Sequence, residues 1–501
     1  MNDTPHQASP RIPRGELIAR NVLFLTVGQI LSTALGIALT ATMGRTLGPS
    51  DFGVCYIIMT IAGFLSVIVD WGQSTFVLKE ISRGRSDQAH LLGSAVLTRS
   101  ALIFGSAAIS AGVAIVVGYP AIVAWLTPLA IIFGLPGSLY QLLSCLFRGK
   151  DRTELDVAAG LVGKLVAVIA TILALLAGGG LVAAVLMPAV GGLAGLAFGL
   201  SLARGLGIEI WRPVGHNIRE LLVEGAPIAI MAFCISARGF IDITLLSLLV
   251  PTDVVGWYGA ARTFIGILLV PASILGMASF PELCRASQSP ADLRQLLSAS
   301  SRLLMAAGSF AFCIVFSFAD VAVNIIYGSN HFDPTALILK VNAPFLLIFF
   351  LNFMLANTAI AIEKSTQIAR ITMVCAGISA ILSWFLISFF QSRIGNGAVG
   401  LMISTCLTEL LMTAGIIAIL PRGIVAGTIL LHLLRAYASA AIVLVLAEYI
   451  LADVTVWVSL PIVTISFVAV SLLTKLISFA DIRTIAMLLQ SILTKLRLGY
   501  S

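Results

Sequence analysis

The 501-residue chain is 59% hydrophobic and only 11% charged, and its mean hydropathy is +1.05. Soluble domains carry about 25% charged residues, so this composition excludes a soluble globular protein and predicts a polytopic helical membrane protein. The formal net charge of +7 does not indicate a nucleic-acid partner, because the basic residues lie between apolar runs, where they set membrane topology.

A series of long apolar runs follows a polar tail at residues 1–20. The runs are continuous and about 20 residues long, as membrane-spanning helices require. This continuity excludes a transmembrane β-barrel, whose strands alternate in polarity over about 10 residues. In chain order, the fourteen predicted spans are 21–43, 52–71, 91–118, 120–147, 155–177, 181–203, 221–250, 256–280, 302–327, 335–362, 369–391, 397–420, 424–450 and 456–477.

The distribution of basic residues tests this number of spans. With fourteen spans both termini lie on one side of the membrane, and the connections on that side carry 22 of the 30 lysines and arginines. The connections on the opposite side carry only Arg45 and Arg393. Because cytoplasmic connections are enriched in lysine and arginine, we expect both termini to be cytoplasmic.

An internal repeat organises the chain. Five residues before and within the second span recur 202 positions later, at the eighth span: Leu47, Pro49, Ser50, Asp51 and Tyr56 match Leu249, Pro251, Thr252, Asp253 and Tyr258. The copies have the same orientation, which predicts two lobes related by a pseudo-two-fold axis along the membrane normal, with a cavity between them. The predicted divisions are an N-terminal lobe at 1–203, a cytoplasmic linker at 204–220, a C-terminal lobe at 221–420, and two additional spans with an amphipathic tail (481–497) at 421–501.

The sequence lacks the common nucleotide-binding, catalytic and metal-binding motifs. It contains no GxxxxGK[ST], HExxH or GxSxG pattern, and its seven cysteines show no CxxC pairing. We therefore expect no enzymatic activity, no cofactor and no metal or disulfide site. The remaining candidates for a functional site are charged residues inside spans. Such residues are costly in lipid, and they usually line a transport pathway or pair with another charged group. The cations are Arg99, Lys164, Arg238, Arg262, Lys340 and Arg435, and the acids inside or near the ends of spans include Asp70, Asp242, Asp320 and Glu409.

The excess of deep cations predicts an anionic cargo, because a fixed positive lining lowers the cost of moving a phosphate or carboxylate through the membrane. Each residue also has a plainer interpretation. Arg238 and Asp242 are four apart and could neutralise each other on one helix face. Arg99, Lys164, Arg262 and Lys340 could extend to a membrane surface. Glu409 is either a proton or sodium carrier or a polar contact between helices.

An ordered set of phrases resembles the flippases of polysaccharide biosynthesis of the Wzx type. In the first half these are Arg45–Gly53, Asp70–Gly72 and Lys79–Glu80. Later phrases also fit: Asp242, Val255–Tyr258, Ala260–Arg262, Phe280–Leu283, Tyr327–Gly328 and Ile362–Lys364. The resemblance covers nearly the whole chain.

This resemblance implies the multidrug/oligosaccharidyl-lipid/polysaccharide transporter fold, with two six-helix lobes and two extra helices. It further implies ion-driven alternating access that moves a polyprenyl-diphosphate-linked oligosaccharide, such as an undecaprenyl diphosphate, to the outer leaflet of the bacterial inner membrane. In this family the first, second, seventh and eighth spans line the lumen, which favours Arg238 and Arg262 and also admits Arg20, Arg45, Asp70 and Asp242. Expected partners are the lipid-linked substrate, membrane lipids, and polysaccharide polymerase and assembly proteins; we expect a monomer.

Other functions stay open at this point. A lipid II-type flippase also has fourteen spans, although no basic cluster in the first two spans matches it. A drug/cation antiporter of the same superfamily favours twelve spans and an acidic cavity. A membrane scaffold for glycan assembly would not need deep charges, and a membrane glycosyltransferase would need a catalytic carboxylate beside a sizeable polar loop.

Overall fold

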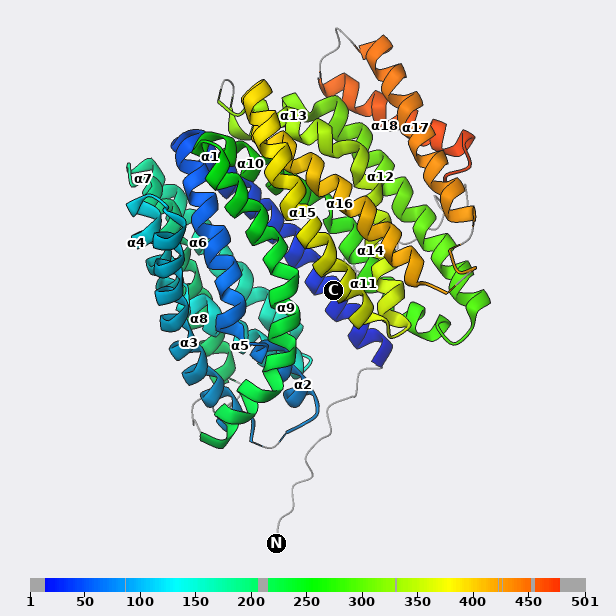
Figure 1. Cartoon of the computed structure of the whole chain (residues 1–501). Helices are drawn as coiled ribbons and strands as arrows, with labels where there is room; N and C mark the ends of the chain where they lie inside the picture. The colour runs from blue at the N-terminus through cyan, green and yellow to red at the C-terminus, as the bar shows by residue number, and fades with distance from the viewer. Residues whose placement is uncertain are drawn as a thin grey trace, which may run out of the picture. The chain divides into compact units, whose positions relative to one another are not determined.

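The structure, a computed structural model, describes residues 14–85, 87–205, 215–328, 331–421, 423–425, 427–451 and 456–477. Within these ranges every regular element is helical, which confirms the predicted all-helical membrane fold (Figure 1). Contacts between residues divide the chain into two units, the first ending at Ile243 and the second beginning at Thr244.

The first unit holds the helices α1 (Arg14–Asp70), α2 (Gln73–Ser82), α3 (Gln88–Val117), α4 (Ala121–Phe133), α5 (Leu135–Gly149), α6 (Thr153–Leu176), α7 (Gly180–Leu186), α8 (Pro188–Gly205) and most of α9 (Gly215–Leu249). The second unit holds α10 (Thr252–Leu268), α11 (Val270–Ala286), α12 (Pro290–Tyr327), α13 (Asp333–Asn342), a 3-10 turn at Ala343–Phe345, α14 (Leu346–Ala361), α15 (Ser365–Ile394), α16 (Gly397–Ile419), α17 (Gly427–Leu451) and α18 (Val456–Leu473).

Helix α1 contains two membrane spans rather than one. Among the described residues, 13 helical segments are long and apolar enough to cross a membrane, and the first of them covers Phe24–Asp70. It is interrupted at Gly48, whose φ of 71° and ψ of 174° lie outside the helical region, and Pro49 cannot donate the next backbone hydrogen bond. The interruption separates the predicted spans 21–43 and 52–71, so the structure agrees with fourteen spans.

Prolines inside spans mark several changes of helix direction. Pro136 and Pro271 lie in the first turns of α5 and α11, directly after breaks in the fourth and eighth spans. Pro344 lies in the 3-10 turn between α13 and α14. By contrast, Pro128 and Pro227 lie within continuous helices. Three of these five prolines therefore lie in the first turn after a helix break, where a missing backbone N–H costs least.

Helix α12 forms the centre of the second unit, where it packs against α11, α13, α14 and α17. The Ser289 side chain accepts a hydrogen bond from the Asp292 backbone N–H at its start, as the Ser289-Pro290 pattern predicts. Helix α12 then continues unbroken to Tyr327. Further along α12, Ser309 Oγ donates to the Ala436 carbonyl at 2.7 Å and joins α12 to α17.

The predicted division into lobes stays a prediction. The contact-based boundary lies inside α9 rather than in the predicted linker. Most of the linker, the polar tail before Arg14 and the predicted amphipathic helix at 481–497 lie outside the described residues.

Candidate functional site

A buried ion pair lies inside the first unit. The Arg99 side chain on α3 has 0% exposure, and its guanidinium pairs with the Asp70 carboxylate at the end of α1. The same guanidinium donates hydrogen bonds to Ser74 Oγ on α2 at 2.7 Å and to the Ser138 carbonyl on α5 at 2.5 Å. One side chain thus connects four helices, and Asp70 compensates a charge that would otherwise be very costly inside the protein.

The local backbone explains how Asp70 reaches this position. Trp71 and Gly72 have positive φ angles of 44° and 72°, so the chain turns sharply between α1 and α2. The turn brings Ser74 back toward Asp70, whose Oδ1 accepts a hydrogen bond from Ser74 Oγ at 2.5 Å. Arg99 therefore contacts Asp70 and does not extend to a membrane surface. Its predicted role as a lumen cation and the predicted ion-coupling role of Asp70 stay predictions.

A cavity of about 270 Å³ adjoins this pair. Its lining combines apolar residues of α1, α3 and α4 with three polar side chains, and Ser138 belongs to both the lining and the ion-pair network. The polar lining residues are Ser66, Ser138 and Gln141. The cavity therefore presents hydrogen-bonding groups inside a helical unit without an exposed cation among its lining residues.

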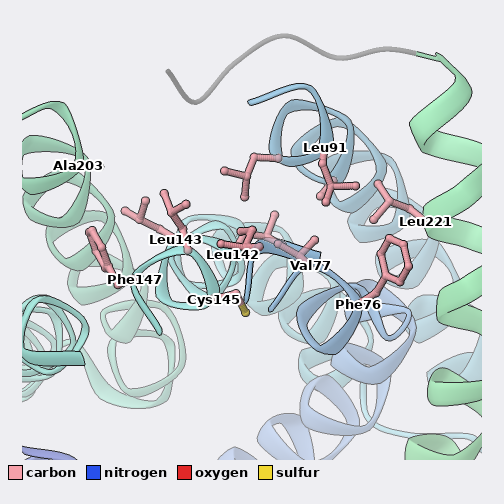
Figure 2. Close-up of a cluster of buried hydrophobic side chains, with 13 residues drawn as sticks. Phe76, Val77, Leu91, Leu142, Leu143, Cys145, Phe147, Ala203 and Leu221 are labelled. Carbon is pink, nitrogen blue, oxygen red and sulfur yellow. The ribbon is translucent and has the colours of Figure 1, made fainter. Parts of the chain in front are cut away.

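Helix α9 is attached to the first-unit helices by a contact that we call the α9 contact, formed by Trp71, Gly72, Leu221, Leu222 and Gly225. Trp71 Nε1 donates to the Leu222 carbonyl at 3.0 Å. At Gly72 and Gly225 the two backbones approach so closely that a Cβ on Gly225 would lie 2.3 Å from the Trp71 carbonyl oxygen. Leu221 is fully buried in the same hydrophobic cluster as Phe76, Val77 and Leu91 (Figure 2).

An ionic network continues the α9 contact at the α2–α3 connection. Arg85 donates to both carboxylate oxygens of Glu220 on α9, at 2.8 and 3.0 Å, and to Asp87 at 2.5 Å. Asn217 Nδ2 donates to Asp87 at 3.3 Å. The hydrogen bonds to Glu220 and then Asp87 raise the pKa of Arg85, and the hydrogen bond from Arg85 lowers the pKa of Asp87. Arg85 and Asp87 are therefore both charged at neutral pH.

Aromatic side chains join α1 to α9 further into the span. The Phe64 ring on α1 stacks on Phe240 with centroids 4.4 Å apart, and it also contacts Phe233 at 4.8 Å. Sequence reasoning missed these residues and the α9 contact. The Asp70–Gly72 phrase was the available signal, because a tryptophan-glycine pair at a span end is suited to a close helix approach.

The other predicted cations of the first unit have different surroundings. Arg45 is exposed on α1, and Arg238 is half-buried on α9, one turn before the buried Asp242. Lys164 is half-buried near the middle of α6 and makes no hydrogen bond or ion pair to any residue that the structure describes. Arg20 lies in α1, and its side chain is outside the described part.

In the second unit, Arg262 is exposed on α10. Lys340 on α13 pairs with Asp320 on α12 at 2.5 Å, and both side chains are partly exposed. The structure therefore gives an acidic partner to Lys340, as it does to Arg99. Their charges are less available to an anionic cargo than an uncompensated cation would be.

Glu409 lies in the interior of the second unit with 5% exposure. Its Oε2 accepts a hydrogen bond from Asn352 Nδ2 on α14 at 2.7 Å. One turn earlier on α16, the Cys406 thiol donates to Asn342 Oδ1 at 3.7 Å. Glu409 is thus a polar contact between α14 and α16, and its predicted ion-coupling role stays a prediction. Within the described residues, no group of three or more His, Cys, Asp or Glu side chains is placed to hold a metal ion.

Comparisons with known proteins agree with this architecture. A family profile described as polysaccharide biosynthesis protein matches residues 18–287, which is more than half of the chain. No curated protein matches the sequence. The solved structure of the lipid II flippase MurJ in an inward closed conformation is similar, with a TM-score of 0.68 and 13% identity over 90% of this chain and 98% of that chain.

Two structures described as conformations of a multidrug resistance MATE family transporter of the MOP superfamily are also similar. The inward-facing structure has a TM-score of 0.59 and 12% identity, covering 83% of this chain and 98% of the other. The outward-facing structure has a TM-score of 0.53 and 12% identity, covering 83% and 96%. At these identities the similarity establishes the fold alone.

Proposed function

Because this chain belongs to the polysaccharide biosynthesis protein family, we propose that it is a flippase for a polyprenyl-diphosphate-linked oligosaccharide. The protein would act in the bacterial inner membrane, with both termini in the cytoplasm, and would serve surface or secreted polysaccharide synthesis. It works as a transporter and not as an enzyme. The lipid-linked oligosaccharide enters from the inner leaflet and leaves to the outer leaflet by alternating access.

The α9 contact is the observation that carries this proposal. Helix α9 begins the second copy of the repeat in sequence, yet its first half packs with helices of the first copy. The positive-charge distribution assigns the connections at this end to the cytoplasm. A contact between the two halves of a duplicated transporter at that end is a closed inner gate. Opening to the cytoplasm therefore requires α9 to separate from α1, α2 and α3.

The composition of the α9 contact suits a reversible gate. It combines one buried leucine, one tryptophan hydrogen bond and a partly exposed ionic network. Exposed ion pairs contribute at most about 1 kcal/mol each, and a net hydrogen bond contributes about 0.5–1.5 kcal/mol. Such a contact is strong enough to hold one state and weak enough for a substrate or an ion to shift the population.

The cations that would meet the diphosphate are Lys164, Arg238 and Arg262. Lys164 follows Val157 by two helical turns, and Val157 packs on Gly28 of α1, so both side chains share the face of α6 that meets the first span. A half-buried cation on this face can attract a diphosphate from the lumen. This position supports Lys164 as a substrate-binding candidate, which the family resemblance alone does not favour.

Glu409 is the proposed coupling residue. A carboxyl group buried between α14 and α16 is costly in its charged form, and proton or sodium binding removes that cost. Asn352 Nδ2 donates to Oε2 of this carboxyl group at 2.7 Å. Transport by a Glu409→Gln variant that keeps the wild-type dependence on pH and on sodium would exclude this role.

The substrate is tested in the cell and with purified protein. Deletion of the gene is expected to cause accumulation of lipid-linked oligosaccharide, identified by mass analysis, in the inner leaflet. Purified protein in liposomes is expected to move a fluorescent polyprenyl-diphosphate sugar to the opposite leaflet. Variants Lys164→Gln, Arg238→Gln and Arg262→Gln are each expected to slow this movement by about fivefold, since one cation near a phosphate contributes about 1 kcal/mol.

Arg393→Gln is the matched control, because Arg393 stacks over Phe389 on an exposed helix end outside the proposed lumen. Equal rates for all four variants and the wild type would remove these cations from the mechanism. Absence of accumulated lipid-linked intermediates in the deletion strain would overturn the proposed substrate.

A lipid II-type flippase is the second candidate. The similarity to the MurJ structure extends over 90% of this chain. Rescue of a strain depleted of its peptidoglycan flippase would favour this candidate. A drug/cation antiporter would instead confer resistance to cationic dyes in the same cells.

A further inference from the structure

A basic pocket lies in the second unit, between the first turns of α12 and the start of α17. Its volume is about 530 Å³, within the range of small-molecule sites. The lining residues that could bind a ligand are all polar or basic: Arg294, Gln295, Ser298, Arg302, Thr428 and His432. None of these residues belongs to the proposed lumen or to the α9 contact.

The pocket follows from the geometry of the two helices. Arg294, Ser298 and Arg302 are spaced four residues apart and form one stripe of α12. Ser298 Oγ donates to Thr428 Oγ1 at 3.4 Å and bridges the helices at the pocket. Two turns beyond Arg302, Ser309 Oγ bonds the Ala436 carbonyl and brings the helices together. The pocket therefore ends at this closer contact.

The electrostatics favour an anion. Two guanidinium groups line the pocket, and no carboxylate is among its lining residues. His432 Nδ1 is buried and makes no hydrogen bond to any residue in the described part of the chain. Clustered arginines bind phosphate oxygens through charge-assisted hydrogen bonds, which are stronger than neutral ones.

The position along the helices favours a lipid as the source of the phosphate. The predicted ninth span begins at Arg302, so the pocket lies at the membrane boundary, on the side that the basic connections assign to the cytoplasm. Residues next to the basic groups are apolar and exposed, with Leu303 at 37% and Leu434 at 58%. A lipid headgroup in the pocket would leave its acyl chains beside such surface.

We propose that this pocket binds the phosphate of an anionic phospholipid of the cytoplasmic leaflet. Basic pockets between transmembrane helices on this side of the membrane are suited to such headgroups. The bound lipid connects α12, in the repeated part of the chain, to α17, the first of the two additional spans. It is a fixed structural ligand and not the transported substrate.

The test uses the full-length purified protein and native mass spectrometry with phosphatidylglycerol, and with phosphatidylcholine as the zwitterionic comparison of zero net charge. Phosphatidylglycerol is expected to bind more tightly. Arg294→Gln and Arg302→Gln are each expected to weaken it about fivefold, and the double variant about 25-fold, since each basic residue near a lipid phosphate contributes roughly one such factor. Arg370→Gln is the matched control, an exposed arginine at the same predicted side of the second unit, and should bind like the wild type.

Several outcomes would overturn the proposal. Equal binding of both lipids, or unchanged binding by the double variant, would leave the pocket without a role in lipid binding. Competition by millimolar inorganic phosphate would identify a site for a free anion. Stronger binding of undecaprenyl diphosphate, lost in the double variant, would assign the pocket to the transported substrate. If Arg302→Gln does not fold, the exposed Arg294 carries the same test alone, because its side chain packs little.

Discussion

Substitution of Gly225 by alanine is expected to open the α9 contact. A Cβ at this position would lie 2.3 Å from the Trp71 carbonyl oxygen, and backbone atoms cannot move aside as a flexible side chain can. The two helices must therefore separate at this point in the closed state. If the α9 contact is an inner gate, the open state has no such clash and its population rises.

The magnitude follows from the cost of overpacking, which is about 1–3 kcal/mol for an added methyl group in a well-packed site. If the open state escapes this cost, its population relative to the closed state increases about 5- to 150-fold. Alanine also favours a helix over glycine by about 0.5–1 kcal/mol, but this effect is the same in both states. Gly239 on the same helix has no atom within 4 Å of a built Cβ, so Gly239→Ala is the matched control.

The assay measures exposure of a buried position in the contact. Leu221 has 0% exposure, so a Leu221→Cys side chain reacts with a small thiol reagent only when α9 separates from the hydrophobic cluster. In a background without the seven native cysteines, the reaction rate reports the open population. Gly225→Ala should raise this rate by the stated factor, and Gly239→Ala should leave it unchanged.

One result would refute the gate. Gly225→Ala could lower the melting temperature and leave the reaction rate equal to that of the control. The α9 contact would then be permanent packing that stabilises the folded protein, and the proposed closed state would have no open counterpart. A rise in rate in both glycine variants would instead show that alanine affects α9 as a helix rather than through the Trp71 carbonyl.

Three further predictions concern charged groups. Asp70→Asn leaves the buried Arg99 without its counter-charge and should lower the free energy of unfolding by about 3–5 kcal/mol, seen as a large drop in melting temperature; a drop below about 1 kcal/mol would mean that the pair is not buried in solution. Because Arg85 lowers the pKa of Asp87, the stabilisation from this pair is complete above the ordinary aspartate value of about 3.9 and is lost as the pH falls through the lower folded value. The open population of the α9 contact, taken as the labelling rate relative to that of an exposed cysteine at the same pH, should therefore stay constant between about pH 5 and 8 and rise only in stronger acid, whereas a rise near pH 6 would point to another group. Lys340→Gln removes a partly exposed pair and should change stability by less than about 1 kcal/mol, measured by the same melting experiment.

The sequence by itself determined that the protein lies in a lipid membrane and how many times the chain spans it. A chain that is 59% hydrophobic must place its helices in lipid, and each run must be long enough to cross it. Two local features also follow from backbone chemistry that the sequence itself carries. They are the interruption of α1 at Gly48-Pro49 and the start of α12 at Ser289-Pro290.

Only the tertiary structure decided which charged residues meet. Arg99 pairs with Asp70 from 29 positions away, and Glu409 bonds Asn352 across 57 positions. Helical periodicity predicts which residues share a face, but it does not say which other helix that face contacts. The same limit hid the α9 contact, where a span that begins the second repeat packs against the first. Its position depends on the packing of glycines, Trp71 and Leu221, and such packing exists only once the helices have assembled.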